Sequence, residues 1–158
     1  MYKSIKSGFG FGITSGVITT LGLIVGLSYG TESKTAVIGG ILTIAIADAM
    51  SDALGIHVSV ESEDGRSAKE IWISTASTFI TKLLIAATFL IPVIIFDLYL
   101  SVLVSVVWGA FLLSSFSFFL AKQRKERPYK VIAEHLFVAT LVIVITFYLG
   151  GFINKNFG

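Results

Sequence analysis

Three ionisable side chains lie inside long apolar runs of the sequence. Asp48 and Asp52 interrupt one run, and Lys82 interrupts the next. A charged group deep in a bilayer is costly unless it is paired or hydrated, so each is a candidate for ion handling. The spacing of four places both carboxylates on one face of a helix. Hard oxygen ligands in this arrangement suit a divalent cation or a proton relay.

A structural role is the alternative for the same three residues. One aspartate would then pair with Lys82, and the other would accept hydrogen bonds from serine or threonine hydroxyls. Lys82 lies roughly 16 Å along its helix, at 1.5 Å per residue, near the depth of Asp48. We therefore expect Lys82 to pair with Asp48 or Asp52 when no ion is bound. The pair would separate when a cation or proton binds the carboxylate.

Two further residues of the same apolar run, and one residue just beyond it, are candidate metal ligands. Met50 and His57 are seven residues apart and share a different helix face, and Glu61 follows one turn later. Methionine is a common gap filler in cores, whereas an imidazole can bind a transition metal or a proton. Packing and binding both remain open for each. The acidic segment 61–64 either attracts cations to the membrane surface or is a solvated loop.

The composition is that of a membrane protein. Of 158 residues, 54% are apolar and 14% are charged, against about 25% charged residues in soluble domains. Five runs are long enough to cross the hydrocarbon core as helices: 8–29, 35–60, 71–96, 98–121 and 131–152. The runs are continuous rather than alternating, which favours helices over a barrel. We predict an all-α integral membrane protein with a single five-helix domain, and a hairpin near Phe96 and Asp97.

The basic residues predict the orientation. Nine lysines and arginines fall at the N-terminus and in the second and fourth loops, whereas Lys34 and Lys155 fall on the other side. This bias predicts a cytoplasmic N-terminus and a C-terminus that is outside or lumenal. The membrane would be the cell membrane of a prokaryote, or a vacuolar or other organelle membrane of a eukaryote. The first run is too long for a signal peptide and lacks a cleavage site near Tyr29, so we expect a retained helix.

Glycines recur every fourth residue in the first run. Small residues at this spacing let helix backbones approach closely in lipid. Six such glycines exceed what one intrachain contact requires, so we predict a homodimer built around this helix, with Thr14, Ser15 and Thr19 facing the seam or an ion path beside it. The alternative is packing of the first helix against the second within one subunit. The glycines are Gly8, Gly12, Gly16, Gly22, Gly26 and Gly30.

Other function classes find little support. Glu134 and His135 lack the second histidine of a metalloprotease motif, and no other constellation indicates an enzyme, so we expect neither catalysis nor a resident cofactor. The absence of cysteine excludes disulfides and thiolate metal sites. The charges fall in short gaps between apolar runs rather than throughout the chain, which argues against a nucleic-acid partner.

The second apolar run resembles the signature of the vacuolar iron transporter family. Residues 47–59 read ADAMSDALGIHVS, where the family reads approximately ADGxSMxxGEYxS. The segment 12–16 is similar to that family's GANDG opening, and Pro92 and the segment 148–150 fall where the family has its I-P and Y-x-x-G elements. The resemblance implies a homodimer of five-helix subunits that moves ferrous iron, or a similar divalent metal, out of the cytoplasm in exchange for protons.

Several positions depart from the family pattern. Asp48 carries over unchanged, but Ser15 replaces an aspartate, Asp52 replaces the motif methionine, and Ile56 replaces the glutamate before His57. The short second connection resembles a form that lacks the family's cytoplasmic metal-binding domain. A carboxylate in place of methionine favours harder cations such as manganese, calcium or magnesium, although Met50 could restore a soft ligand. The competing interpretation is a non-transporting membrane subunit in which the buried charges only lock helices together.

Overall fold

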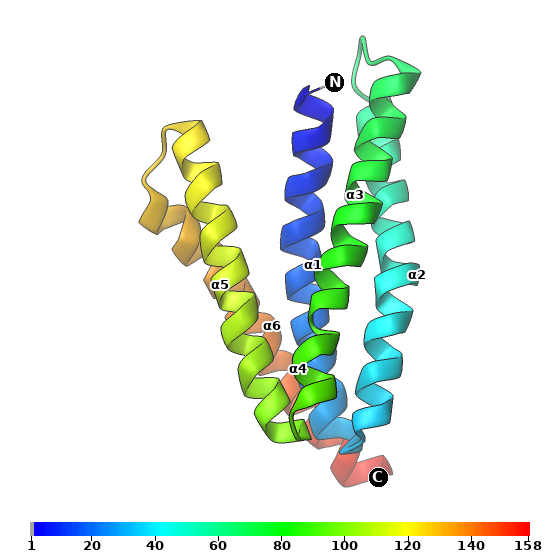
Figure 1. Cartoon of the computed structure of the whole chain (residues 1–158), viewed down its shortest axis with the longest axis vertical. Helices are drawn as coiled ribbons and strands as arrows, with labels where there is room; N and C mark the ends of the chain where they lie inside the picture. Colours follow the sequence, from blue (N-terminus) through cyan, green and yellow to red (C-terminus); the bar gives the residue numbers. More distant parts are fainter. Residues whose placement is uncertain (1) are drawn as a thin grey trace.

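A computed structural model describes the backbone of residues 2–158 and the side chains of residues 6–158. No strand occurs in this described part of the chain. Its helices are α1 (Tyr2–Thr31), α2 (Lys34–Glu61), α3 (Ala68–Thr88), α4 (Leu90–Ile95), α5 (Leu98–Arg124) and α6 (Pro128–Phe157) (Figure 1). Five segments are long and apolar enough to cross a membrane, with α3 and α4 together forming one of them. The predicted all-α membrane protein with five spanning segments is confirmed.

Capping residues define where the helices begin. Ser33 caps α2, Ser67 caps α3 with Glu70 completing a capping box, and Asp97 caps α5. Pro128 opens α6 at a position where its missing N–H is not needed. The connections between spanning segments are short, so consecutive spanning segments run in opposite directions. The hairpin predicted near Asp97 is confirmed.

The third spanning segment is interrupted, although the sequence predicted one continuous helix over 71–96. α3 ends at Thr88 and α4 begins at Leu90. Pro92 causes the interruption, because its ring lacks an N–H and would clash with the carbonyl of Thr88 in a regular helix. The Thr88 hydroxyl accepts a hydrogen bond of 3.0 Å from Nε1 of Trp108 on α5. A hydrogen bond therefore joins the interrupted turn to α5.

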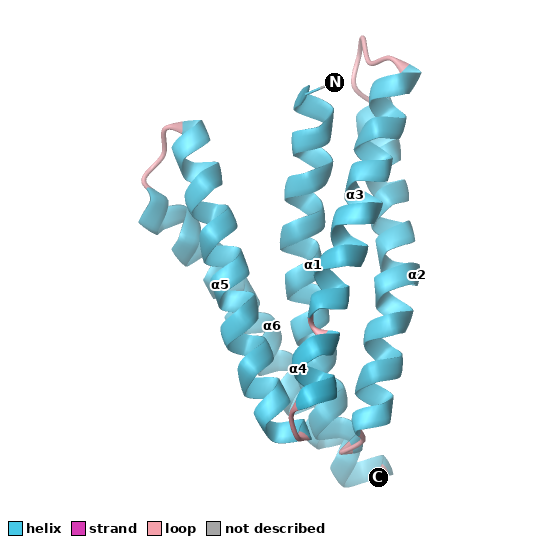
Figure 2. Cartoon of the chain, viewed as in Figure 1, coloured by secondary structure: helices cyan, strands magenta, loops and turns pink. Residues whose placement is uncertain are grey.

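The helices form two groups around α1. Figure 1 shows α2 and α3 on one side of α1 and the α5–α6 hairpin on the other. The N-terminus and the α2–α3 and α5–α6 loops lie at one end, here the N-terminal end, and the C-terminus lies at the opposite end. At the N-terminal end α5 leans away from α1, and at the opposite end the helices converge. Figure 2 shows that loops occur at the two ends and at the interruption between α3 and α4.

The spanning helices extend beyond the apolar runs that predicted them. α1 covers residues 2–31 rather than 8–29, and α6 covers residues 128–157 rather than 131–152. The added turns of α6 carry Lys130, Asn154, Lys155 and Asn156. Hydropathy located the apolar part of each helix, and the helices continue past it.

The glycines of α1 pack against other helices of the same chain. A Cβ on Gly12 would lie 2.8 Å from Cβ of Thr81 on α3, and a Cβ on Gly22 would lie 2.8 Å from Cγ1 of Val142 on α6. Gly8 and Gly16 also face α3, and Gly26 and Gly30 also face α6. The prediction that these glycines form a subunit seam is wrong, because intrachain neighbours fill both rows. The alternative, packing of these glycines within one chain, is correct, but the helices that they contact are α3 and α6 rather than α2.

The buried core surrounds α1. Val17 and Leu21 of α1 are buried with Ile41 of α2, Phe89 at the α3–α4 junction and Leu113 of α5. Large apolar side chains cover the outside instead of polar ones, as the surface of a bilayer-spanning bundle requires. Those exposed by more than 60% include Trp72, Leu103, Phe119, Phe137 and Tyr148.

Candidate functional site

Lys82 is the buried centre of an ionic cluster formed by three helices. Its side chain is only 1% exposed. Its Nζ lies 2.5 Å from Oδ2 of Asp48, donates a hydrogen bond to Oδ2 of Asp52, and donates another of 3.0 Å to Oγ of Ser15. The predicted pairing of Lys82 is confirmed, and it involves both aspartates at once. Ser15, on α1, completes the cluster, which we call the Lys82 cluster.

Local sequence brings these four residues together. The spacing of four places Asp48 and Asp52 on the face of α2 beside α3. Gly12 permits the close approach of α3, because a Cβ there would lie 2.8 Å from Cβ of Thr81, the residue before Lys82. The glycines of α1 therefore bring α3 close enough for Lys82 to reach Ser15. All four residues lie well inside their spanning segments, far from either helix end.

The cluster is a closed network of donors and acceptors. The Ser15 hydroxyl donates to Oδ2 of Asp52 at 2.6 Å while accepting from Lys82. Oδ2 of Asp48 is buried without a hydrogen bond, so its contact with Lys82 is an ion pair alone. With all groups ionised, two carboxylates face one ammonium and leave one negative charge in excess. Such a set can accept a proton or an additional cation.

The carboxylates are more accessible than the lysine. The Asp48 side chain is 32% exposed and the Asp52 side chain is 22% exposed, against 1% for Lys82. They lie next to the outward face of α2, so the acidic side of the cluster opens toward the outside of the bundle. On that side the cluster presents carboxylates rather than the ammonium.

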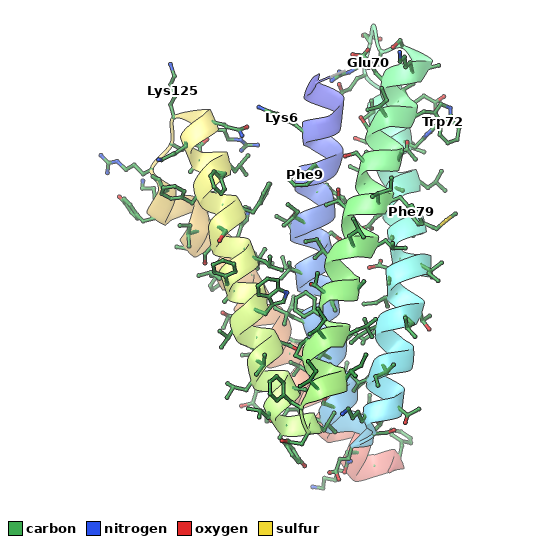
Figure 3. The ribbon with its side chains drawn as sticks, viewed as in Figure 1. Lys6, Phe9, Glu70, Trp72, Phe79 and Lys125 are labelled. Atoms are coloured by element: carbon green, nitrogen blue, oxygen red, sulfur yellow. The ribbon has the colours of Figure 1, made fainter. Side chains whose placement is uncertain are left out.

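The structure keeps the other three candidate ligands apart from the Lys82 cluster. Met50 is 59% exposed on the outward face of α2, and Glu61 is exposed at the last residue of that helix. Nδ1 of His57 lies 2.9 Å from Oγ1 of Thr75 on α3, and its ring meets Trp72 edge to face. Trp72 lies on the outer side of the bundle near the N-terminal end (Figure 3). In one subunit, only Ser15, Asp48 and Asp52 of the predicted metal ligands gather.

A complete metal site does not form within one subunit. Among the described residues, no group of three or more His, Asp or Glu side chains is close enough to hold a metal ion. Asp48, Asp52 and Ser15 supply three ligand side chains, whereas Mn²⁺ or Mg²⁺ prefers six ligands. In the acidic loop, Glu63 is already engaged at 2.5 Å by Arg66.

Two histidine contacts were not anticipated from the sequence. Thr75 meets His57, and Ser117, which is fully buried on α5, meets Nδ1 of His135 at 2.6 Å. In both cases the hydroxyl and the imidazole come from consecutive spanning segments. Ser117 and His135 each lie seven residues from the helix end at their shared loop, so symmetry about that loop could have identified this pair. His57 lies four residues and Thr75 seven residues from the helix ends at theirs, so this signal does not identify the other pair.

Comparison with known proteins adds no assignment. No protein-family model matches the chain, and no curated protein matches it. The site must therefore be interpreted from its own residues and geometry.

Proposed function

We propose that this protein transports a divalent metal cation in exchange for protons. One observation carries the proposal: a lysine buried inside a spanning segment is held by two carboxylates that remain partly accessible. Buried ionisable groups in spanning segments are expensive and commonly mark ion pathways. The resemblance of residues 47–59 to the vacuolar iron transporter signature adds independent support and suggests iron or manganese as the cargo.

Competition for the carboxylates would couple the two ions. A divalent cation bound to Asp48 and Asp52 would remove the counter-charges of Lys82. A buried ammonium without counter-charges is costly, so entry of the cation would be balanced by movement of Lys82 away from the carboxylates or by departure of a proton from the site. Protonation of the aspartates would in turn weaken metal binding and restore the empty state. Each ion thereby displaces the other from one set of oxygens.

The charge distribution suggests the direction of transport. Basic residues concentrate in the two loops at the N-terminal end and beside α1, although the side chain of Lys3 lies outside the described residues. We place this end in the cytoplasm, following the usual bias of lysine and arginine. Metal would then leave the cytoplasm while protons enter it.

A second copy of the chain would complete the site. One stripe of α2 is exposed, carries only small side chains, and runs beside Asp48 and Asp52. A Cβ at Gly39 or Gly55, within this stripe, would meet nothing within 4 Å. Close packing of two such stripes would cover the partly exposed carboxylates of Asp48 and Asp52. It would bring four carboxylates together, two from each copy, with Met50 on the same outward face. The stripe consists of Gly39, Thr43, Ala47, Ser51, Gly55 and Ser59.

Flux measurements test the proposal. Purified protein in proteoliposomes is given a pH gradient, and uptake of Fe²⁺, Mn²⁺, Zn²⁺, Co²⁺ and Ca²⁺ is compared with that of empty vesicles. Asp48→Asn keeps the side-chain shape and removes the charge, so we expect it to abolish flux. Glu134→Gln, at an exposed carboxylate of α6, is the matched control and should transport normally. Undiminished flux in Asp48→Asn, or no flux of any metal in the parent protein, would refute the proposal.

The alternative is a membrane subunit in which the cluster only joins helices. It is favoured by the contacts of Lys82, which link α1, α2 and α3 through side chains of the protein itself. In that case the Asp48→Asn variant would lose stability, and neither it nor the parent protein would carry metal. Flux and stability measured on the same preparations separate the two functions.

A further inference from the structure

A second polar site lies on the opposite side of α1 from α2. A partly open cavity of about 530 Å³ is lined by α1, α5 and α6 near the N-terminal end. Its volume falls within the usual range of ligand pockets, about 300–1,000 Å³. Its lining combines two cations, Lys6 and Arg124, with an amide, Gln123, and four phenylalanines. The proposed transport function uses none of these residues.

The two cations lie just outside apolar runs of the sequence. Lys6 precedes the run 8–29 in α1, and Arg124 follows the run 98–121 in α5. Nζ of Lys6 donates a hydrogen bond of 3.0 Å to Oε1 of Gln123, which joins the two helices. Figure 3 shows Lys6 extending from α1 toward α5. The polar part of the cavity is therefore at the level of lipid headgroups.

The wall on the hydrocarbon side is aromatic. Phe9 and Phe11 of α1 and Phe116 and Phe119 of α5 line it, each at least three residues further into its spanning segment than Lys6 or Arg124. Phe9 and Phe116 meet edge to face with ring centroids 6.4 Å apart. Gly10 leaves space for the Phe116 ring, because a Cβ there would lie 3.1 Å from it. The cavity is thus basic at its headgroup end and aromatic at its hydrocarbon end.

His135 adds a polar group from α6. The buried hydroxyl of Ser117 donates to the carbonyl of Leu113 at 2.5 Å, so its oxygen is left to accept from Nδ1 of His135 at 2.6 Å. This arrangement assigns the Nδ1 proton and leaves Nε2 for a ligand. Ser117 therefore holds the imidazole ring in the wall of the cavity.

The surrounding loop strengthens the attraction for anions. The segment 122–130 contains five lysines and arginines and one glutamate. Basic pockets between spanning helices bind the headgroups of anionic lipids. A free phosphate ester would pair with the cations equally well, but it has no apolar part to contact the four phenylalanine rings.

We propose that this cavity binds one anionic phospholipid, with its phosphate between Lys6 and Arg124 and an acyl chain along the phenylalanines. The lipid bridges α1 to the α5–α6 hairpin at the end where these elements separate. The inference depends on the membrane-spanning fold and is independent of metal transport.

Native mass spectrometry of the full chain tests the proposal. The protein is exchanged into mixed micelles with dioleoyl phosphatidylglycerol or dioleoyl phosphatidylcholine, or is mixed with soluble glycerol phosphate. We expect one phosphatidylglycerol to be retained per chain, with much weaker retention of the other two. Equal retention of phosphatidylcholine would refute the role of the anionic headgroup. Equal binding of glycerol phosphate would identify a soluble phosphate ester instead and refute the lipid.

Matched variants locate the bound lipid. Lys6→Gln with Arg124→Gln should weaken phosphatidylglycerol retention roughly thirtyfold, about fivefold for each cation near the membrane surface. Lys125→Gln with Lys130→Gln removes the same charge from the same end but outside the cavity lining, and should change retention far less. Figure 3 shows Lys125 pointing outward from the end of α5. Equal losses in the two double variants would show a diffuse surface effect and overturn the site.

A double variant that exchanges the two cations is the control for misfolding. Lys6→Arg with Arg124→Lys keeps both cations, so it should retain the lipid nearly as well as the parent protein. Loss of the lipid in this variant, with an unchanged circular dichroism spectrum, would count against a headgroup site based on charge.

Discussion

Removing the Lys82 ammonium should destabilise the protein mainly through the carboxylates left behind. Lys82→Met preserves the length of the stem that packs beside Gly16 and removes only the charge and its hydrogen bonds. The ammonium contacts two aspartates and one serine while being 1% exposed. Its loss leaves two neighbouring carboxylates facing each other without a cation.

The expected magnitude follows from burial. Removing one partner of a buried ion pair costs about 3–5 kcal/mol, because the other charge remains uncompensated. The aspartate side chains keep 32% and 22% of their surface, so partial solvation relieves some of this cost. We expect Lys82→Met to lose about 3 kcal/mol, near the lower end of that range. Adding Asp52→Asn removes one of the two facing charges and should recover about 2 kcal/mol.

A double-mutant cycle measures this coupling. The parent protein, both single variants and the double variant are purified in a mild detergent and unfolded with sodium dodecyl sulfate, with helix content followed by circular dichroism. Glu134→Gln combined with Lys82→Met is the control and should be additive, since Glu134 lies outside the cluster. Additive destabilisation by Lys82→Met and Asp52→Asn would refute the coupling on which the proposed ion exchange depends.

Three further outcomes follow from contacts outside the cluster. Gly12→Leu should destabilise the fold by about 1–3 kcal/mol through overpacking against α3, as measured by the same unfolding. Gly55→Leu should leave the fold intact, because a side chain at this position would meet no neighbour within 4 Å. It should convert the proposed α2-mediated dimer to monomer in mass measurements. An intact dimer would place the interface elsewhere. Lys34→Met should lower the free energy of unfolding by about 2 kcal/mol, because Nζ donates hydrogen bonds of 2.9 Å to the carbonyls of Ile94 and Phe96 at the end of α4. Unchanged stability would show that water replaces these hydrogen bonds.

The sequence predicted the spanning segments and the central ion pairing correctly. Apolar runs of fixed length and the requirement for satisfied backbone amides leave few alternatives in lipid. The depths of Asp48 and Lys82 along antiparallel helices were enough to bring them together. Helical periodicity thus determines which residues share a face and a depth.

Periodicity does not determine which neighbour a face meets. The glycines of α1 have the same spacing in both rows, yet one row packs on α3 and the other on α6. Met50 is only two residues from Asp48 and Asp52, but it projects outward while both aspartates reach Lys82. These outcomes depend on the order of helices around α1, which no local pattern encodes.

The position of α1 links the two sites through its packing. Thr14 lines the cavity beside α5, and the next residue, Ser15, joins the Lys82 cluster. Gly8 and Gly12 bring α1 close to the backbone of α3, whereas α5 contacts α1 at the N-terminal end through large side chains around the cavity. The packing at that end is therefore closer between α1 and α3 than between α1 and α5. A lipid bound there would alter the separation of the hairpin from α1 without breaking the contacts that hold Ser15 against Lys82.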